Sequence, residues 1–342
     1  MSLCKSRSLK IMGSVVSGGG HHEVNFYDVI SLENLLLAWR QFSRGKRSNS
    51  AVAKFELRLE EHIFSLYERL MRGEWVNDPY VCRLISDPKP RIIHIASVRD
   101  RVLFQAVYQI LYQIFDKTFI HDSFASRKYK GAHAGVKRFE IFVRKASANY
   151  TRNAFVLKCD VKKFFDNIDH SVLFSLISKR ITDEKLLALI HVIISSFYTV
   201  LGKGLPLGNV TSQLFANIYL NELDQFVKHE LKEEYYIRYC DDFAILGGGA
   251  IVLETLVGKI SDFLGRKLLL KLHPSKVIIR KLRRGIDFLG YVSLPHYRIL
   301  RTTTKRRMFA RVCRINLPSY LGMLQYCKGW RISKRLGKIL NC

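Results

Sequence analysis

Two adjacent aspartates between strand-like runs constrain this chain more than any other feature. Asp241 and Asp242 follow Tyr235–Arg238 and precede Phe243–Leu246, two runs of mostly aromatic and aliphatic residues. The pattern predicts a β-hairpin with two carboxylates at its tip. Adjacent acids repel and Asp is depleted from strands, so the pair requires a compensating charge, usually a divalent cation. A solvated turn, which favours Asp for local reasons, is the alternative interpretation.

A third acid stands upstream in a similar setting. The apolar run from Ala154 to Cys159 predicts a buried strand that delivers Asp160 at its end. Capping residues at 166–170 predict a helix soon afterwards. Two strands from distant sequence, each ending in Asp, can converge on Mg²⁺, which prefers oxygen ligands. Two such ions about 3.5–4 Å apart would activate a primer hydroxyl and stabilise a departing pyrophosphate.

The charge of the chain is strongly basic and unevenly placed. The formal net charge is +27, and the segment from Arg266 to Lys338 holds twenty Lys and Arg residues against the single acid Asp287. Unopposed like charge destabilises a compact chain unless a partner neutralises it, so the segment favours a polyanion such as nucleic acid. A solvated basic surface is the plain alternative. Interleaved aromatics could stack on bases or belong to the core.

Cysteine usage and hydropathy indicate the cellular compartment in which the chain is expected to work. The seven cysteines include no Cys-x-x-Cys pair and form no zinc-like spacing with histidine, which favours a reduced, cytoplasmic compartment. The polar, basic start predicts no signal peptide. The most apolar stretch, Leu186–Leu201, is interrupted by polar residues and is too short to span a bilayer, so no membrane partner is expected.

Six motifs in chain order resemble those of the reverse transcriptases of bacterial retroelements over roughly residues 85–340. The first is Lys89-Pro90-Arg91 with Val98–Val102, similar to the fingers motif that meets the incoming triphosphate. Cys159–Asp166 is similar to the first palm motif, and Gly204–Gln213 is similar to the motif that contacts the dNTP and the template. Tyr239–Asp242 is similar to the Tyr-x-Asp-Asp motif. His273–Lys276 is similar to the motif whose Lys lies near the phosphates, and Phe288–Tyr291 is similar to the primer grip.

The resemblance implies a role for each motif. Asp160, Asp241 and Asp242 would be catalytic and would hold two Mg²⁺ ions, or Mn²⁺ as a substitute, together with the Val161 carbonyl. The implied dNTP contacts are Lys89, Arg91, Phe165, Leu207, Gly208, Gln213 and Lys276. The implied primer grip is Phe288, Leu289, Gly290 and Tyr291. A bulky Phe165 would exclude a ribose 2′-OH; a core aromatic is the alternative there, and a surface lysine is the alternative for Lys276.

Two departures from the common pattern narrow the resemblance. Leu207-Gly208 stands where most reverse transcriptases have Gln-Gly, and Ser212-Gln213 stands where they have Ser-Pro. This combination, with Tyr320–Leu324 and Trp330-Arg331, is similar to the enzymes of diversity-generating retroelements. Those enzymes copy a template repeat RNA with frequent errors at adenines, and they bind a small, basic, ring-forming accessory protein. An apolar Leu207 cannot donate a hydrogen bond near the nascent pair, so mispairs should be penalised less.

The implied fold class is α+β, a right-hand polymerase fold with fingers, palm and a short helical thumb. The expected division is a mobile N-terminal tail at 1–30, fingers at 31–153, a palm carrying the Tyr-x-Asp-Asp motif at 154–292, and a short basic thumb at 293–342. Helical spacing predicts helices within 31–72, 100–115, 209–230 and 250–266. Only about fifty residues follow Tyr291, so no ribonuclease H or endonuclease module is expected there.

The expected partners are template RNA, a primer, the RNA–DNA hybrid and dNTPs. Lys305, Arg306 and Arg307 are the expected thumb contacts to nucleic acid or to the accessory protein. Three alternative interpretations fit part of the motif pattern: an antiphage or retron reverse transcriptase, a group II intron maturase, and a non-catalytic RNA-binding scaffold that kept a polymerase shape. The intact aspartates argue against the scaffold.

Overall fold

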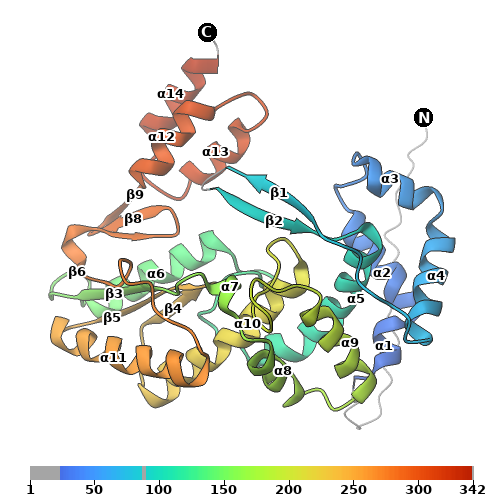
Figure 1. The fold of residues 1–342 in the computed structure, drawn as a ribbon. Coiled ribbons are helices and arrows are strands. Elements are labelled where there is room, and N and C mark those ends of the chain that lie inside the picture. Colours follow the sequence, from blue (N-terminus) through green and yellow to red (C-terminus); the bar gives the residue numbers. More distant parts are fainter. Residues whose placement is uncertain (1–23, 87–89, 341–342) are drawn as a thin grey trace, which may run out of the picture.

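A computed structural model describes residues 24–86 and 90–340 of the chain (Figure 1). The predicted tail at 1–30 therefore lies largely outside the described residues, as does Lys89. For residues 26–30 the prediction of a mobile tail is corrected. Phe26–Ile30 form helix α1, which Asn25 caps and which buries Phe26, Val29 and Ile30. This apolar face packs into the core, so residues 26–30 belong to the folded body.

The fingers segment is mainly helical. Helices α2 (Leu32–Ser43), α3 (Ser50–Leu57), α4 (Leu59–Met71) and α5 (Val98–Phe115) form its body, as the helical spacing predicted. Ser31, Asn49 and Ser97 cap three of these helices by accepting backbone N–H bonds. Between α4 and α5 a two-stranded ribbon, β1 (Val81–Ile85) and β2 (Arg91–Ile95), projects from the helices (Figure 1).

The palm is a four-stranded antiparallel sheet in the order β4-β5-β3-β6. Its strands are β3 (Phe155–Asp160), β4 (Tyr236–Tyr239), β5 (Asp242–Gly247) and β6 (Ile278–Lys281). Side chains alternate between the two faces of a strand. Leu157 and Cys159 therefore pack with α11 (Ala250–Lys267), while Val156 packs with α6 (Ala132–Ala146). Although α6 lies inside 31–153, its Phe139 and Phe142 cover the palm sheet.

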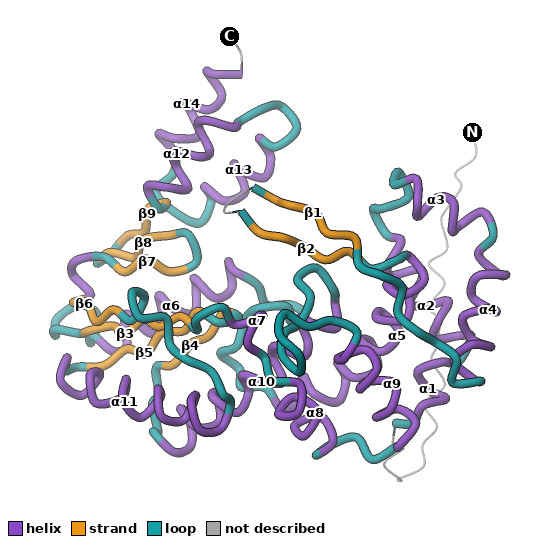
Figure 2. Tube along the Cα trace, in the orientation of Figure 1, coloured by secondary structure: helices purple, strands orange, loops and turns teal. Residues whose placement is uncertain are grey.

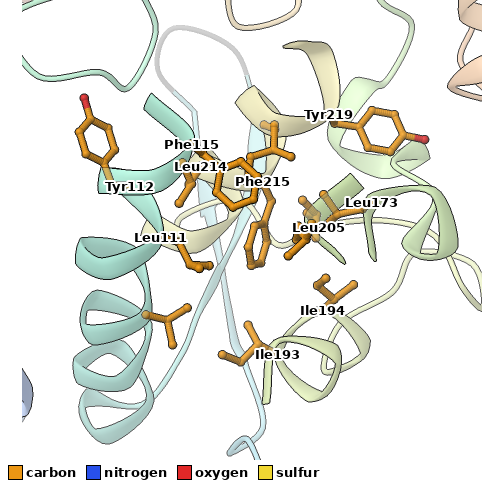
Figure 3. Close-up of a cluster of buried hydrophobic side chains, with 14 of the residues drawn as sticks. Leu111, Tyr112, Phe115, Leu173, Ile193, Ile194, Leu205, Leu214, Phe215 and Tyr219 are labelled. Carbon is orange, nitrogen blue, oxygen red and sulfur yellow. The ribbon is translucent and has the colours of Figure 1, made fainter. Parts of the chain in front are cut away.

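Helix α10 joins the palm to the fingers. It runs from Val210 to Gln225, continues as one π-helical turn at Phe226–Glu230, and contacts α5, α8 and α11. Helices α7 (Phe164–Asn167), α8 (His170–Ser178) and α9 (Glu184–Ser195) precede it. Apolar side chains of α5, α8, α9 and α10 gather into a single cluster (Figure 3), which includes Leu111, Phe115, Leu173, Ile193, Ile194, Leu214 and Phe215.

The C-terminal segment carries a second sheet and three helices. Strands β7 (Ile286–Phe288), β8 (Tyr291–Leu294) and β9 (Tyr297–Leu300) pair antiparallel in that order. Helices α12 (Thr302–Arg311), α13 (Leu317–Leu324) and α14 (Trp330–Leu340) lie above this sheet (Figures 1 and 2). Met308, Leu324 and Leu336 give the segment its own small apolar core. Among the described helices, none is both long and apolar enough to cross a membrane.

A buried ion pair ties α10 to the central hairpin. Arg238 on β4 donates to Asp224 on α10 through Nε at 2.7 Å and Nη2 at 2.6 Å, and both side chains are fully buried. Tyr236 Oη donates to the same carboxylate at 2.7 Å. Burial alone would lower the pKa of Arg238, but the Asp224 carboxylate outweighs it and the pKa is raised. Arg238 therefore keeps its charge beside Asp224, and each partner depends on the other.

Removing one partner of this pair should be costly. Asp224→Ala is expected to lower the free energy of unfolding by about 3–5 kcal/mol, because it leaves a buried guanidinium without its counter-ion. The control is Glu222→Ala, two residues earlier on α10, where the partly exposed pair with Lys179 at 3.7 Å should contribute less than about 1 kcal/mol. Denaturant unfolding of both variants measures the difference, and equal losses would contradict the assigned role.

Candidate active site

The Asp-Asp turn is held from behind by Arg238. Strand β4 ends at Tyr239 and β5 begins at Asp242, as the hairpin prediction required. Cys240, in the turn between them, has a φ of +56°, a conformation that is costly for a residue with a Cβ. Arg238 Nη1 donates to the Cys240 carbonyl at 3.0 Å. The same guanidinium that pairs with Asp224 thus fixes the strained turn.

Strand register brings the third acid to the turn. Asp160 is directly opposite Asp242 across β3 and β5, so their side chains share one face of the sheet. Asp241 adjoins this pair, because its carbonyl accepts the Val161 N–H at 3.3 Å. The predicted meeting of two distant strands, each with an aspartate at its end, is confirmed by this pairing, and a shared catalytic role of the three acids stays a prediction.

Burial and neighbouring negative charge raise the pKa values of the two turn aspartates. Burial is the largest cause for both turn residues; it raises the pKa of Asp242 to about 6 and that of Asp241 above its usual value. The charge of Asp160 adds to both shifts. Oδ1 of Asp242 is buried with no hydrogen-bond partner among the described atoms. The turn therefore concentrates more buried negative charge than the protein's own donors satisfy.

Two lysines partly balance this charge. Lys276 Nζ lies 2.8 Å from Asp160 Oδ1, and Lys158 Nζ lies 3.2 Å from Asp242 Oδ2. Lys276 reaches its place because the His273 N–H donates to the Asp160 carbonyl at 2.8 Å, which lays the predicted Lys motif along the end of β3. Lys158 also donates to the Asp287 carbonyl at 3.0 Å, so it joins the palm sheet to β7.

The donor set fits a divalent cation that is completed by a substrate. Within residues 24–86 and 90–340, no group of three His, Cys, Asp or Glu side chains is gathered closely enough to hold an ion alone. Mg²⁺ in nucleotide enzymes usually binds one or two carboxylates and takes its other ligands from phosphates and water. Asp160 and Asp241 meet that need, and the unpaired oxygen of Asp242 shows charge still to be satisfied.

Two of the predicted nucleotide residues border one cavity. Arg91, at the start of β2, and Leu207 line a cavity of about 550 Å³ together with Lys163, His94 and Phe197. The Leu207 carbonyl accepts the His94 N–H at 3.0 Å, which attaches the dNTP motif to the fingers ribbon.

The other nucleotide residues lie around this motif. Phe165 is half-buried against Phe164, and its carbonyl accepts the N–H of Leu205 in the cavity wall at 2.8 Å. Gly208 adopts φ +117° beside the His94 carbonyl, which a Cβ there would approach to 3.5 Å. Gln213 is exposed on the first turn of α10.

The predicted primer grip is only partly at the surface. Phe288 and Tyr291 are 1% exposed: Phe288 stacks on Phe139, and Tyr291 Oη donates to the Met323 carbonyl at 2.9 Å. Only Leu289 and Gly290, which form the turn at φ +50° and +88°, are half-exposed. The predicted primer grip of four residues is corrected for Phe288 and Tyr291, which anchor the hairpin in the core, and it stays a prediction for Leu289 and Gly290.

The remaining predicted contacts lie on the thumb. Lys305 and Arg306 are exposed on α12, and Arg307 is half-buried there. Sequence reasoning missed Lys158, Arg238, Asn217 and Asp224. The available signal for Lys158 and Arg238 was a charged residue inside an apolar, strand-like run, where burial demands a partner.

Comparison with known proteins settles the family. Residues 86–293 match the family model described as "Reverse transcriptase (RNA-dependent DNA polymerase)". The chain belongs to the reverse transcriptase family. It is an RNA-directed DNA polymerase, and enzymes of this family use divalent metal ions. The family assignment drawn from the six motifs is thereby confirmed, and the diversity-generating subtype remains a prediction.

Two relatives and one structure illustrate the likeness. Protein YkfC of Escherichia coli is 25% identical over 69% of this reverse transcriptase and 72% of YkfC. The group II intron-encoded protein LtrA of Lactococcus lactis is 25% identical over 68% of this chain, which spans only 49% of LtrA. A telomerase from Candida albicans superposes with a TM-score of 0.51 at 12% identity, over 71% of this chain and 50% of that one. The predicted α+β polymerase fold is consistent with this likeness.

Metal binding should be visible without catalysis. Because the pKa of Asp242 is raised to about 6, its ionisation opposes folding above that pH, and a bound cation offsets this cost. Millimolar Mg²⁺ or Mn²⁺ is therefore expected to raise the Tm of the wild type near pH 8, and the increment should vanish as the pH falls through about 6. Differential scanning calorimetry measures it. Asp241→Asn should abolish the increment; an unchanged increment in that variant would contradict the site.

Proposed function

We propose that this reverse transcriptase extends a primer on an RNA template at Asp160, Asp241 and Asp242. The observation that carries the proposal is the register of β3 and β5, which sets Asp160 opposite Asp242 and beside the Asp241 turn. Two Mg²⁺ ions, or Mn²⁺, bound to Asp160 and Asp241 with the Val161 carbonyl would lower the pKa of the primer hydroxyl and neutralise phosphate charge. Asp242, paired with Lys158, supports the site from behind.

The residues around the turn receive the nucleotide. Arg91 and Lys163 present positive charge at the cavity, which suits a triphosphate. Lys276 pairs with Asp160 in the free protein, and we expect it to pair with the phosphates when a nucleotide binds. Phe165 lies beside the cavity wall, where its ring would crowd a ribose 2′-OH. Lys89, Gly208 and Gln213 are proposed to complete the contacts to the triphosphate and the template.

Neutralising the carboxylates should stop synthesis and spare binding. Asp160→Asn and Asp241→Asn are each expected to lower dNTP incorporation by at least about 100-fold, because charge stabilisation at the reacting phosphate is lost. Affinity for a primer–template should change little. Asp262→Asn, an exposed acid on α11, is the matched control. Primer extension and filter binding measure the two properties; full incorporation by either variant would sink the assignment.

We further propose that this enzyme is error-prone at template adenines, as in a diversity-generating retroelement. Leu207 supports this, because its carbonyl is fixed to β2 and its side chain reaches the nucleotide cavity with no polar atom to offer. An apolar contact discriminates by only about 1–3 kcal/mol, whereas a directed hydrogen bond penalises a wrong geometry more. The template would be a repeat RNA beside a variable target gene.

Restoring a polar group should restore accuracy. Leu207→Gln is expected to lower misincorporation opposite adenine while extension is retained. Leu201→Gln, in the same loop but 85% exposed, is the matched control and should change nothing. Sequencing of cDNA made on one adenine-containing RNA measures both variants. Equal error at adenine in wild type and Leu207→Gln would refute the role of Leu207, and a wild type already accurate at adenine would remove the subtype.

The thumb is proposed to bind a polyanion or a partner. Lys305, Arg306 and Arg307 lie on α12, in a segment whose excess basic charge suits the RNA–DNA hybrid. A small, basic, ring-forming accessory protein is a further proposed partner, with a cytoplasmic setting. A group II intron-like role is the second candidate, because LtrA is among the relatives. A template repeat beside the gene would favour the first role, and intron sequence would favour the second.

A further inference from the structure

Tyr129 is an aromatic side chain that nothing in the fold explains. It is fully exposed, at 100% of its accessible surface, in the loop between Phe124 and Gly131. Its φ is +61°, a region that bulky L-residues rarely adopt. A glycine would satisfy this backbone at no steric cost. Tyr129 thus exposes a large ring to water at a position where the backbone conformation favours glycine.

The loop around Tyr129 is rigid rather than loose. Arg127 is 7% exposed and pins it, donating to Asp116 Oδ1 at 2.6 Å and to the carbonyls of Ile120 and Ser123 at 2.7 and 3.1 Å. The Lys128 N–H donates to Tyr112 Oη at 2.9 Å. A side chain carried on a backbone that is already held in place loses less conformational entropy on binding, which is a property of binding surfaces.

This loop adjoins the catalytic turn. The bridge between Ser123 and Arg238 is parallel, so the chain beyond Ser123 leaves the sheet at the end where Asp241 and Asp242 lie. Asn217 connects the two segments, because its Nδ2 donates to the Ala125 carbonyl at 2.9 Å while its Oδ1 accepts from Arg238 at 3.2 Å.

On its other side the loop approaches the primer-grip turn. The Gly131 N–H closes the loop onto the Phe124 carbonyl at 2.9 Å, and α6 begins at the next residue. A Cβ on Gly135 would lie 3.0 Å from Leu289 Cδ1, so Leu289 packs directly on this helix. His133 stacks on Tyr326 of the thumb with ring centroids 3.8 Å apart. The loop therefore lies where palm, primer grip and thumb meet.

We propose that Tyr129 is a nucleic-acid contact, whose ring packs against a sugar of the primer–template duplex just behind its growing end. The inference rests on the proposed function, in which a primer is extended at the aspartate turn, and on the predicted primer contact at Leu289. Lys128 and Lys130 adjoin Tyr129 in the chain, but Lys130 Nζ donates to the His121 carbonyl at 2.9 Å and Lys128 Nζ lies 5.4 Å from the centre of the Tyr112 ring. The fully exposed ring of Tyr129 is therefore the group that this loop offers to a partner. A contact to the sugar is tolerant of sequence, as a polymerase requires, because every nucleotide carries the same sugar.

The decisive variant is Tyr129→Gly, because it should raise the Tm while it lowers the affinity for a primer–template. Relief of the positive φ should raise Tm by about 1–3 °C. Loss of the ring should weaken primer–template affinity by about fivefold to 100-fold. The log–log salt slope should stay unchanged, since no charge is removed. Fluorescence anisotropy with a labelled RNA–DNA duplex over a salt series measures affinity and slope together.

Two further variants isolate the ring. Tyr129→Phe keeps the ring and should keep wild-type affinity. Ser126→Gly relieves a similar φ of +52° in the same loop without removing a ring, so it should raise Tm and leave affinity unchanged. If Ser126→Gly weakens binding as much as Tyr129→Gly does, loop rigidity rather than the ring is responsible and the proposal is overturned.

The outcomes also separate this inference from the proposed function. A wild type that binds the duplex and extends the primer, with Tyr129→Gly equal to it in affinity, would overturn the inference alone. A wild type that neither binds nor extends any primer–template would overturn the proposed function first. Weaker duplex binding by Tyr129→Gly, with its salt slope and fold intact, supports the contact.

Discussion

The buried pair of Arg238 and Asp224 is the interaction on which the catalytic geometry depends. One guanidinium satisfies the α10 carboxylate, holds the strained Cys240 carbonyl and bonds Asn217, which in turn holds the loop at Ala125. Taking two charges out of water is expensive, and a buried ion pair adds little net stability over a packed apolar pair. Its value here is positional: α10, the hairpin and the following loop cannot shift independently while all these bonds are made.

A second constraint is the crowding of negative charge at the end of the sheet. Antiparallel register puts Asp160 and Asp242 face to face, and burial raises the pKa of Asp242 to about 6. Lys158 and Lys276 each neutralise one carboxylate, and both reach outward, the first to β7 and the second to the mouth of the site. An arrangement that costs stability in the free protein is ready to bind cations and phosphates.

Individual strands and helices could be predicted from the sequence where a single local pattern determined them. The β3 strand, the Asp-Asp hairpin and helix α5 follow from apolar runs and capping residues that need no distant partner. Local patterns failed where burial was decided by tertiary packing: Phe288 and Tyr291 lie in the core, and residues 26–30 form a helix inside the predicted tail. The Arg238–Asp224 pair was out of reach, since nothing local links residues on different elements.

We propose that the ends of β3 and β5 form a metal-dependent polymerase site. Anomalous diffraction from crystals grown with Mn²⁺, an RNA–DNA primer–template and a non-hydrolysable dNTP is the decisive measurement. We expect anomalous peaks between the carboxylates of Asp160 and Asp241 and the triphosphate, with Arg91 and Lys276 on the phosphates. A triphosphate bound elsewhere, or Mn²⁺ absent from these two aspartates while the dNTP is in place, would contradict it.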